Sequence, residues 1–387
     1  MPGEGTIYKP KSGIAPRLGI TIDLSGDHTT ALKFHYGKYF HGVMGMWFGH
    51  WTYTSTYAEY IWNGEEYELD FIDDMLETHE IDPDLKFPYL NNFVIGIERQ
   101  LGRDMMIGVS AIYREHHNLM DSVNISGQWN QISWTDPYGI GTHNIFERIN
   151  PGENVKYVTN PKAGEDYGQA FSGIVPFTPS RKYTGIEFTF RKRFSDGWQF
   201  QAAYTYSRSK GSDDNSWGEY EDGRTSSLGA STLFLNPNWS YNAEGTLTRD
   251  HPHILKLAGS VVLPLKITLG VYYSFASQQT YNHNIRIPRD IDPDSVGLFA
   301  GRLRFYGEEK GSFRYPSQHN LDMRLEKFFT FGENFRLGLL MDMFNVLNSS
   351  TVDSIEDYVD PGQEFPWGYT WGIVPPRTFR LGLHFEF

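Results

Sequence analysis

The sequence contains no cysteine and carries more acidic than basic side chains. Among its 387 residues, 47 Asp and Glu outnumber 34 Lys and Arg, so the formal net charge is -13. Without cysteine there is no disulfide framework and no thiolate metal site. An acidic chain is also poorly suited to nucleic acid, because binding phosphates requires basic surface patches. We therefore expect no nucleic-acid partner.

Long apolar runs and catalytic motifs are absent as well. No stretch of about 18 apolar residues occurs, so the sequence predicts no transmembrane helix. The first residues, MPGEGTIYKPKSG, lack the basic and apolar regions of a signal peptide. No GxSxG, HExxH or Walker pattern is found. We expect no catalytic residue, no cofactor and no metal, and therefore a protein that is not an enzyme.

The last eleven residues, RTFRLGLHFEF, alternate strictly between apolar and polar positions. Successive side chains of a strand point to opposite faces, so this segment would have one apolar and one wet face. It ends on an aromatic residue, as the C-terminal assembly signal of outer-membrane barrels does. The residues of this predicted signal are Phe379, Leu381, Leu383, Phe385 and Phe387.

Similar alternation recurs along the chain in pairs of segments joined by short turns. Most of the segments are long enough to cross a bilayer as tilted strands, which takes roughly 9–11 residues. Antiparallel strands are predicted near 16–24, 29–40, 91–101, 104–116, 183–195, 198–209, 252–263, 266–276, 319–330, 334–346 and 377–387.

The predicted connections alternate between short and long. Short turns fall near 26, 103, 196, 264 and 332, and the long segments between them cover 41–88, 117–181, 209–249, 278–316 and 349–376. Loops this long are uncommon in compact soluble domains. Short periplasmic turns and long extracellular loops are typical of outer-membrane barrels. The aromatic content of 16% fits, because Tyr and Trp suit the membrane–water interface. We therefore predict an all-β, antiparallel transmembrane β-barrel.

The direction of the strands predicts a partial barrel. If the short turns are periplasmic, the final strand ends in the periplasm and the strand at 16–24 starts outside. A complete barrel starts and ends in the periplasm, which makes its strand number even. An odd count of about eleven and the absence of a signal peptide both lead us to expect further strands upstream. Residues 1–387 would then be one partial barrel domain.

With these segments placed, the chain resembles the C-terminal part of a TonB-dependent outer-membrane receptor, of the Oar-like branch with a carboxypeptidase-regulatory-like domain. The resemblance rests on APRLGITIDLSGDHTTALKFHYGKYF, LKFPYLNNFVIGIERQLGRD, YTGIEFTFRKRFSDGWQFQAAYTYSRSKG, DMRLEKFFTFGENFRLGLLMDMFNVLNSS and PPRTFRLGLHFEF. Such receptors form 22-stranded barrels closed by a plug. The resemblance implies the C-terminal half of such a barrel in the bacterial outer membrane, with the plug and the first half absent from this chain.

This resemblance also implies a function and partners. The intact protein would take up a nutrient when TonB acts on the plug. Its partners would be outer-membrane lipid, the missing plug and barrel half, the TonB complex through that plug, and the barrel-assembly machinery through the C-terminal strand. Two alternatives remain: a secreted soluble β-rich protein, lectin-like or structural, and a passive porin-like channel.

Aromatic residues in the long loops are the candidate ligand contacts, because loops on a rigid scaffold often carry function. These are Trp47, Trp51, Trp129, Trp134, Trp217, Trp239 and Trp367. The first two belong to an aromatic stretch, GMWFGHWTYTSTY, for which a membrane-interface girdle or a loop core is the favoured interpretation.

Three other features are given structural interpretations. The acidic segment 70–84 is expected to be a solvated loop, with a calcium site as the alternative. Adjacent His116 and His117 point apart on an extended chain, so they should chelate poorly together. Charged residues on the wet face should line the lumen: Arg191, Arg193, Asp322, Arg324 and Glu326.

Overall fold

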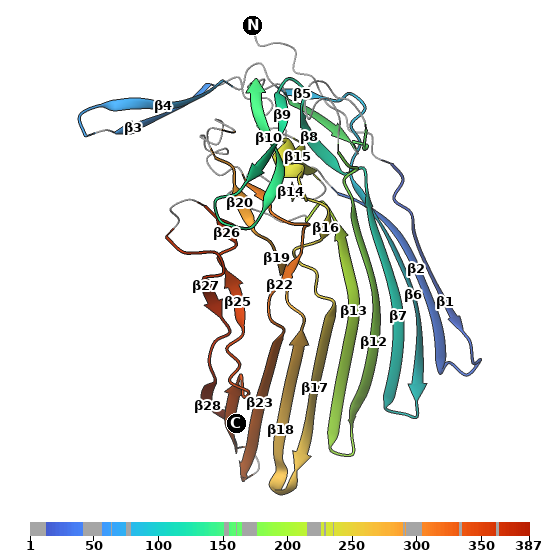
Figure 1. The fold of residues 1–387 in the computed structure, drawn as a ribbon. Coiled ribbons are helices and arrows are strands. Elements are labelled where there is room, and N and C mark those ends of the chain that lie inside the picture. Colours follow the sequence, from blue (N-terminus) through green and yellow to red (C-terminus); the bar gives the residue numbers. More distant parts are fainter. Residues whose placement is uncertain are drawn as a thin grey trace.

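The computed structural model is almost entirely β-structure (Figure 1). It describes residues 13–41, 56–62, 64–74, 79–150, 155–159, 161–164, 176–214, 226–227, 230–234, 236–288, 291, 304–332, 335–360 and 364–387. Within these ranges, the helical elements are the single turns α2 (Pro237–Ser240) and η2 (Pro264–Lys266). No helix in the described part is long and apolar enough to cross a membrane.

One large antiparallel sheet dominates the molecule, and neighbours along its main path are neighbours in sequence order among the long strands. In spatial order its strands are β1 (Arg17–Asp23), β2 (Thr30–Phe40), β6 (Tyr89–Leu101), β7 (Met105–His117), β12 (Arg181–Ser195), β13 (Trp198–Gly211), β17 (His253–Leu263), β18 (Ile267–Ala276), β23 (Gln318–Phe331), β24 (Phe335–Phe344) and β28 (Thr378–Glu386).

These strands confirm all eleven segments predicted from the sequence, each within two residues at either end. The sheet has a twelfth member, β16 (Gly245–Thr246), which pairs with the end of β13. Because β16 is only two residues long, it shows no alternation of apolar and polar residues, and the sequence did not predict it. The turns need left-handed backbone, and Gly102, Gly197 and Leu265 adopt positive φ there.

Pairing in register separates the side chains of the sheet onto two faces. Ile95 pairs with Ala111, which pairs with Ile186, and this row continues the apolar face across neighbouring strands. The opposite face is polar: Arg324 pairs with Asp342, which pairs with Arg380. Alternation therefore produces the apolar outer face and the charged inner face that the sequence predicted.

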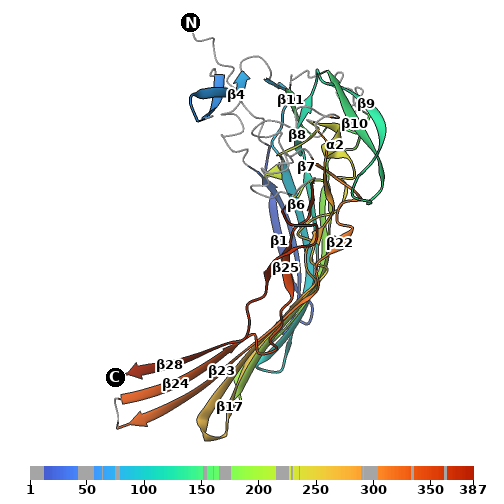
Figure 2. The same ribbon diagram turned by 60° about the vertical axis from the view of Figure 1, so that its left-hand side comes forward.

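The sheet is strongly curved and stays open in the structure (Figures 1 and 2). Its edges are β1 and β28, which do not pair with each other among the described residues. An unpaired edge presents unsatisfied backbone groups, which hydrocarbon does not tolerate. The described strands of the predicted barrel thus form a curved, open sheet.

The long connections fold into smaller sheets beyond one end of the long strands, opposite the short turns, and the hairpin of β3 (Thr56–Trp62) and β4 (Tyr67–Asp74) projects away from the others (Figure 1). The smaller sheets are two hairpins, β3 with β4 and β9 (Gln128–Thr135) with β10 (Thr142–Asn150); a five-stranded sheet of β14 (Ser226–Ser227), β15 (Ala230–Phe234), β8 (Met120–Asn124), β11 (Val155–Thr159) and β5 (His79–Ile81); β19 (Thr280–Tyr281) with β22 (Phe313–Arg314); β21 (Arg304–Tyr306), β20 (Asn284–Arg286) and β26 (Tyr358–Val359); and β25 (Val352–Ile355) with β27 (Thr370–Ile373).

The buried hydrophobic core lies in these loops. One cluster forms around Val123 and Phe234, and a second around Ile285 and Phe305. The large sheet instead exposes its apolar side chains, as a wall does that faces lipid on its outer side. The loops therefore form a packed assembly with its own core, which the sequence analysis did not predict.

Candidate ligand-binding site in the long loops

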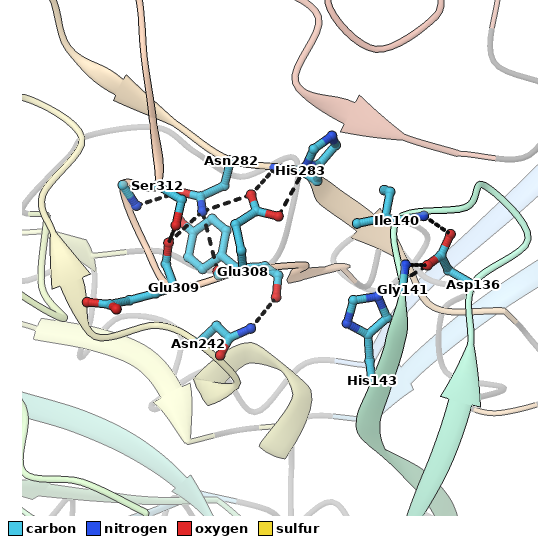
Figure 3. A network of polar contacts seen from close by, with 12 residues as sticks. Asp136, Ile140, Gly141, His143, Asn242, Asn282, His283, Glu308, Glu309 and Ser312 are labelled. Atoms are coloured by element: carbon cyan, nitrogen blue, oxygen red, sulfur yellow. Dashed lines mark hydrogen bonds and ion pairs between the residues drawn. The ribbon is translucent and has the colours of Figure 1, made fainter.

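Residues of the loop assembly are held together by a polar network around Asn282 (Figure 3). Its side-chain amide donates to the Glu309 carbonyl oxygen at 2.9 Å and to the Glu308 carboxylate at 3.2 Å. The same carboxylate accepts from the His283 amide at 2.7 Å and contacts its imidazole Nδ1 at 3.0 Å. Gly311 closes the ring by donating to the Asn282 oxygen at 2.7 Å. The network fixes the segment after β19 against the segment after β21.

A second polar centre, in the same view, shapes the tip of the β9–β10 hairpin (Figure 3). The buried Asp136 carboxylate accepts from the amides of Tyr138, Ile140 and Gly141, and from His143 Nε2 at 3.3 Å. Burial acts to raise the pKa of Asp136, but these hydrogen bonds outweigh burial and hold the pKa below its ordinary value of 3.8.

Five aromatic rings meet beside the polar network. Trp367 stacks on His283 with ring centroids 4.0 Å apart. The Tyr281 ring lies 6.0 Å from Trp367 and 4.8 Å from Tyr315, and Phe313 packs against both Tyr281 and Trp367. These rings come from the β18–β23 and β24–β28 connections, so two long loops share one aromatic cluster.

A pocket of about 240 Å³ opens next to this cluster, at the base of the loop assembly. Three connections meet there, β13–β17, β18–β23 and β24–β28. Its lining consists of Asp214, Thr248, Arg249, Gln279, Thr280, Tyr281, Tyr315, Ile355 and Asp357. The volume is at the small end for a ligand pocket and fits one small polar group or one ring of a larger ligand.

Hydrogen bonds hold the walls of the pocket in place. Thr248 donates its amide to Asp214 at 2.9 Å, and Lys310 Nζ lies 2.5 Å from the same carboxylate. The Ile355 amide donates to the Tyr315 hydroxyl at 3.3 Å. The geometry is therefore set before any ligand arrives, which lowers the entropic cost of binding.

The two phenols stay neutral at physiological pH. Burial raises the pKa of Tyr315 to about 12, and burial also raises the pKa of Tyr281 above its ordinary value. Neutral phenols next to carboxylates and a guanidinium can donate and accept hydrogen bonds. The lining thus offers carboxylates, hydroxyls and one guanidinium as hydrogen-bonding groups to a polar ligand.

The predicted tryptophan contacts fall in different places. Trp47, Trp51 and Trp217 lie outside the described residues, as does the stretch GMWFGHWTYTSTY up to its last two residues, which begin β3. Trp129 and Trp239 are 5% and 7% exposed and belong to the two hydrophobic clusters.

The remaining two tryptophans are partly buried. Trp134 packs on the second cluster, and Trp367 lies in the aromatic cluster beside the pocket. A ligand role for the seven tryptophans stays a prediction. The sequence did not predict the pocket residues Tyr281, Tyr315, Asp214 and Asp357, because they come from separate loops and share no motif.

The other predicted features are placed as follows. Phe379, Leu381, Leu383, Phe385 and Phe387 are all exposed, the first four along the outer face of β28 and the last directly after it. The rings of His116 and His117 have different partners: His116 stacks on His41 and His117 stacks on Tyr89. Among the residues that the structure describes, no three metal-ligating side chains cluster, and residues 75–78 of the acidic segment lie outside that part.

Comparison with known proteins decides the family. Residues 71–270, more than half of the chain, match the family described as outer membrane beta barrel domain. This chain belongs to that family.

The TonB-dependent transporter Oar of Myxococcus xanthus is 22% identical over 282 residues, which cover 71% of this chain and 22% of Oar. The family match and this relative confirm the resemblance drawn from the sequence and the location in the bacterial outer membrane.

Two solved outer-membrane receptors share the fold of this chain. The siderophore receptor PirA from Acinetobacter baumannii superposes with a TM-score of 0.51 at 12% identity, over 98% of this chain and 42% of PirA. FpvA of P. aeruginosa, solved with a bound pyoverdine–iron complex, gives 0.50 at 12% identity, over 96% of this chain and 33% of FpvA. The chain thus spans less than half of each relative. These relatives are transporters and receptors rather than enzymes.

Proposed function

We propose that this chain is the barrel part of an energy-coupled uptake receptor whose long loops bind a nutrient at the outer surface. The observation that carries the proposal is the pre-formed pocket beside Tyr281 and Tyr315, at the meeting point of three loops. A passive channel needs an open path, whereas a selective receptor needs a rigid contact surface. The packed core of the loops supports the second.

The remaining parts of the receptor belong to the same proposal. Further barrel strands would pair with the open edges at β1 and β28, and a plug domain would fill the lumen. TonB would act through that plug, and the barrel-assembly machinery would bind the C-terminal strand. A soluble lectin-like protein is disfavoured, because membership of an outer-membrane barrel family places the apolar outer face in lipid.

Uptake by cells tests energy coupling. Strains with and without the gene would be given three radiolabelled probes: an iron-loaded siderophore, a maltooligosaccharide and a tripeptide. We expect gene-dependent uptake of one probe that stops when a protonophore collapses the proton-motive force. Gene-dependent uptake that continues with the protonophore would establish a passive channel instead.

A pair of variants tests the pocket with that probe. Tyr281→Ala removes an aromatic wall of the pocket and should weaken binding by about tenfold or more, since a buried aromatic contact contributes of order 1–3 kcal/mol. Tyr67→Ala, in the exposed β3–β4 hairpin, is the matched control and should bind as the parent does. Equal binding by both variants would remove the pocket from the proposal.

A further inference from the structure

Three side chains at the loop end of the sheet bring buried nitrogen atoms together on its inner face. His41 follows β2, His116 is near the end of β7, and Arg181 begins β12. The His41 and His116 rings are parallel, with centroids 5.2 Å apart and planes inclined by 7°. Lys182 pairs with Glu115, so Arg181 lies beside His116 on the next strand.

Alternation places all three side chains on the inner face. Ala111 and Ile186 belong to the apolar outer row. His116 and Arg181 each lie five residues from a member of that row, an odd number, so both point the other way. Phe34 pairs with Ile95 of the same outer row. His41 lies seven residues after Phe34, again an odd number, so its side chain points to the inner face as well.

Each of these side chains keeps a buried polar atom without a hydrogen-bond partner among the described residues. The atoms are His41 Nε2, His116 Nδ1 and Arg181 Nη1. Buried polar atoms in native proteins are normally paired, and an unpaired one costs about 1–3 kcal/mol. Three such nitrogens in one cluster therefore call for a shared acceptor.

On the outer face, the residues adjacent in sequence to His116 and Arg181 do have polar partners. Lys182 Nζ lies 3.1 Å from Glu115, and His117 Nε2 lies 3.6 Å from the same carboxylate. His117 and Lys182 are sequence neighbours of His116 and Arg181, yet both have the Glu115 carboxylate as a partner on their own face. The unpaired nitrogens thus belong to the inner face alone at this pair of positions.

The charges around the cluster favour an anion. Arg181 interacts electrostatically with both imidazoles, and Arg114 and His117 interact with His116. Arg114 is itself anchored, donating Nε to Asn92 at 2.9 Å. The carboxylate that interacts with His41 is Asp213. The two guanidinium groups, Arg181 and Arg114, carry the positive charge of the cluster, and with this one carboxylate they leave it with a positive charge on a chain of net charge -13.

We propose that His41, His116 and Arg181 form a binding site for an oxyanion, a phosphate or carboxylate group, on the inner wall below the loops. The Arg181 guanidinium donates without an acceptor of its own, and each imidazole donates from its unpaired nitrogen in the tautomer that carries the hydrogen there, so hydrogen bonds to an oxyanion satisfy the three side chains together. A metal ion fits less well, because the Arg181 cation would repel it. The site does not depend on the proposed transport function.

Inorganic phosphate is the probe, and acetate is the competitor. The full-length protein, purified from outer membranes in detergent, would be dialysed to equilibrium against ³²P-phosphate. We expect saturable binding that acetate reduces, together with a rise in the midpoint of chemical unfolding when phosphate is present, because a ligand that binds the folded state stabilises it.

Variants on the two faces make the test specific. Arg181→Gln should weaken phosphate binding by about tenfold or more and His116→Gln by about threefold to tenfold, whereas Lys182→Gln and His117→Gln should stay within about twofold of the parent. Arg181→Lys keeps the charge without the planar fork and should fall between parent and Arg181→Gln. Migration on gels before and after heating verifies that each variant is assembled.

Several results would overturn the proposal. One is the absence of saturable phosphate binding and of phosphate-dependent stabilisation in the parent. Another is equal loss in the inner-face and outer-face variants, which would indicate diffuse attraction. Binding of Zn²⁺ without binding of phosphate would identify a metal site instead.

Discussion

The Asp342 carboxylate of β24 accepts two hydrogen bonds from the Arg380 guanidinium on the neighbouring strand β28, at 2.9 and 2.6 Å. Arg324 of β23 donates to the same carboxylate from the other side at 2.6 Å. One buried acid thus ties together the last three strands of the sheet on the inner face, and it leaves the group with one surplus positive charge.

Removing this acid should destabilise the edge of the sheet. Asp342→Ala leaves two arginines facing each other without a carboxylate, and we expect a loss of roughly 1–3 kcal/mol in the free energy of unfolding. Chemical unfolding in detergent, followed by tryptophan fluorescence, measures it. Arg336→Gln breaks the exposed pair with Glu386 and should cost less than about 1 kcal/mol. Equal losses of unfolding free energy in the two variants would show that Asp342 stabilises the sheet no more than an exposed ion pair does.

The terminal strand offers a test of its two faces. Leu383 lies on the outer face, 64% exposed, and pairs with Leu339. Leu383→Arg should place a charge in hydrocarbon at a cost of roughly 2–4 kcal/mol near the midplane. His384→Arg, one residue on, points to the inner face and should be far milder. Membrane assembly of the full-length parent is measured by heat-modifiability, and equal tolerance of both changes would contradict a transmembrane β28.

Acid should open the β9–β10 hairpin. The folded-state pKa of Asp136 lies below its ordinary value, so its stabilising effect is fully present above about pH 4 and is lost as the pH falls through the folded pKa. Hydrogen exchange of the hairpin amides should therefore lose protection, corrected for intrinsic rates, as the pH drops below about 4. Asp136→Asn should show weaker protection at neutral pH and little dependence on pH in this range. A variant that keeps the parental pH dependence would exclude Asp136 as its cause.

The loop core should loosen independently of the sheet. Phe305 is fully buried and packs against Trp134, His143 and Tyr241. Phe305→Ala should cost about 3–5 kcal/mol in the free energy of unfolding of the loop assembly. We expect faster protease cleavage in the loops with unchanged heat-modifiability of the sheet. Tyr67→Ala, an exposed aromatic, serves as the control, and loss of the sheet together with the loops would show that the two are one cooperative unit.

Most strands of the large sheet could be predicted from the sequence, because the pattern of side chains within each strand indicates which face is apolar. Apolar and polar side chains alternate with a period of two, and Gly102 or Gly197 marks the turn where the chain reverses. The long loops carry no such period. Trp129 lies in the hairpin strand β9 and Trp239 in the helical turn α2, and no periodic pattern in the sequence indicated that either would be buried.

The sequence by itself determined the strands, their order along the chain, the lipid-facing side of each and the alternation of short and long connections. These features follow from neighbours in the chain, because side-chain direction and turn geometry are set within a few residues. The tertiary structure alone decided what depends on distant segments. It brought Tyr281 and Tyr315 together with Asp357 around a pocket, and it placed His41 against His116 rather than His116 with His117. Such contacts arise from strand register and loop packing across the sheet, and no local pattern encodes them.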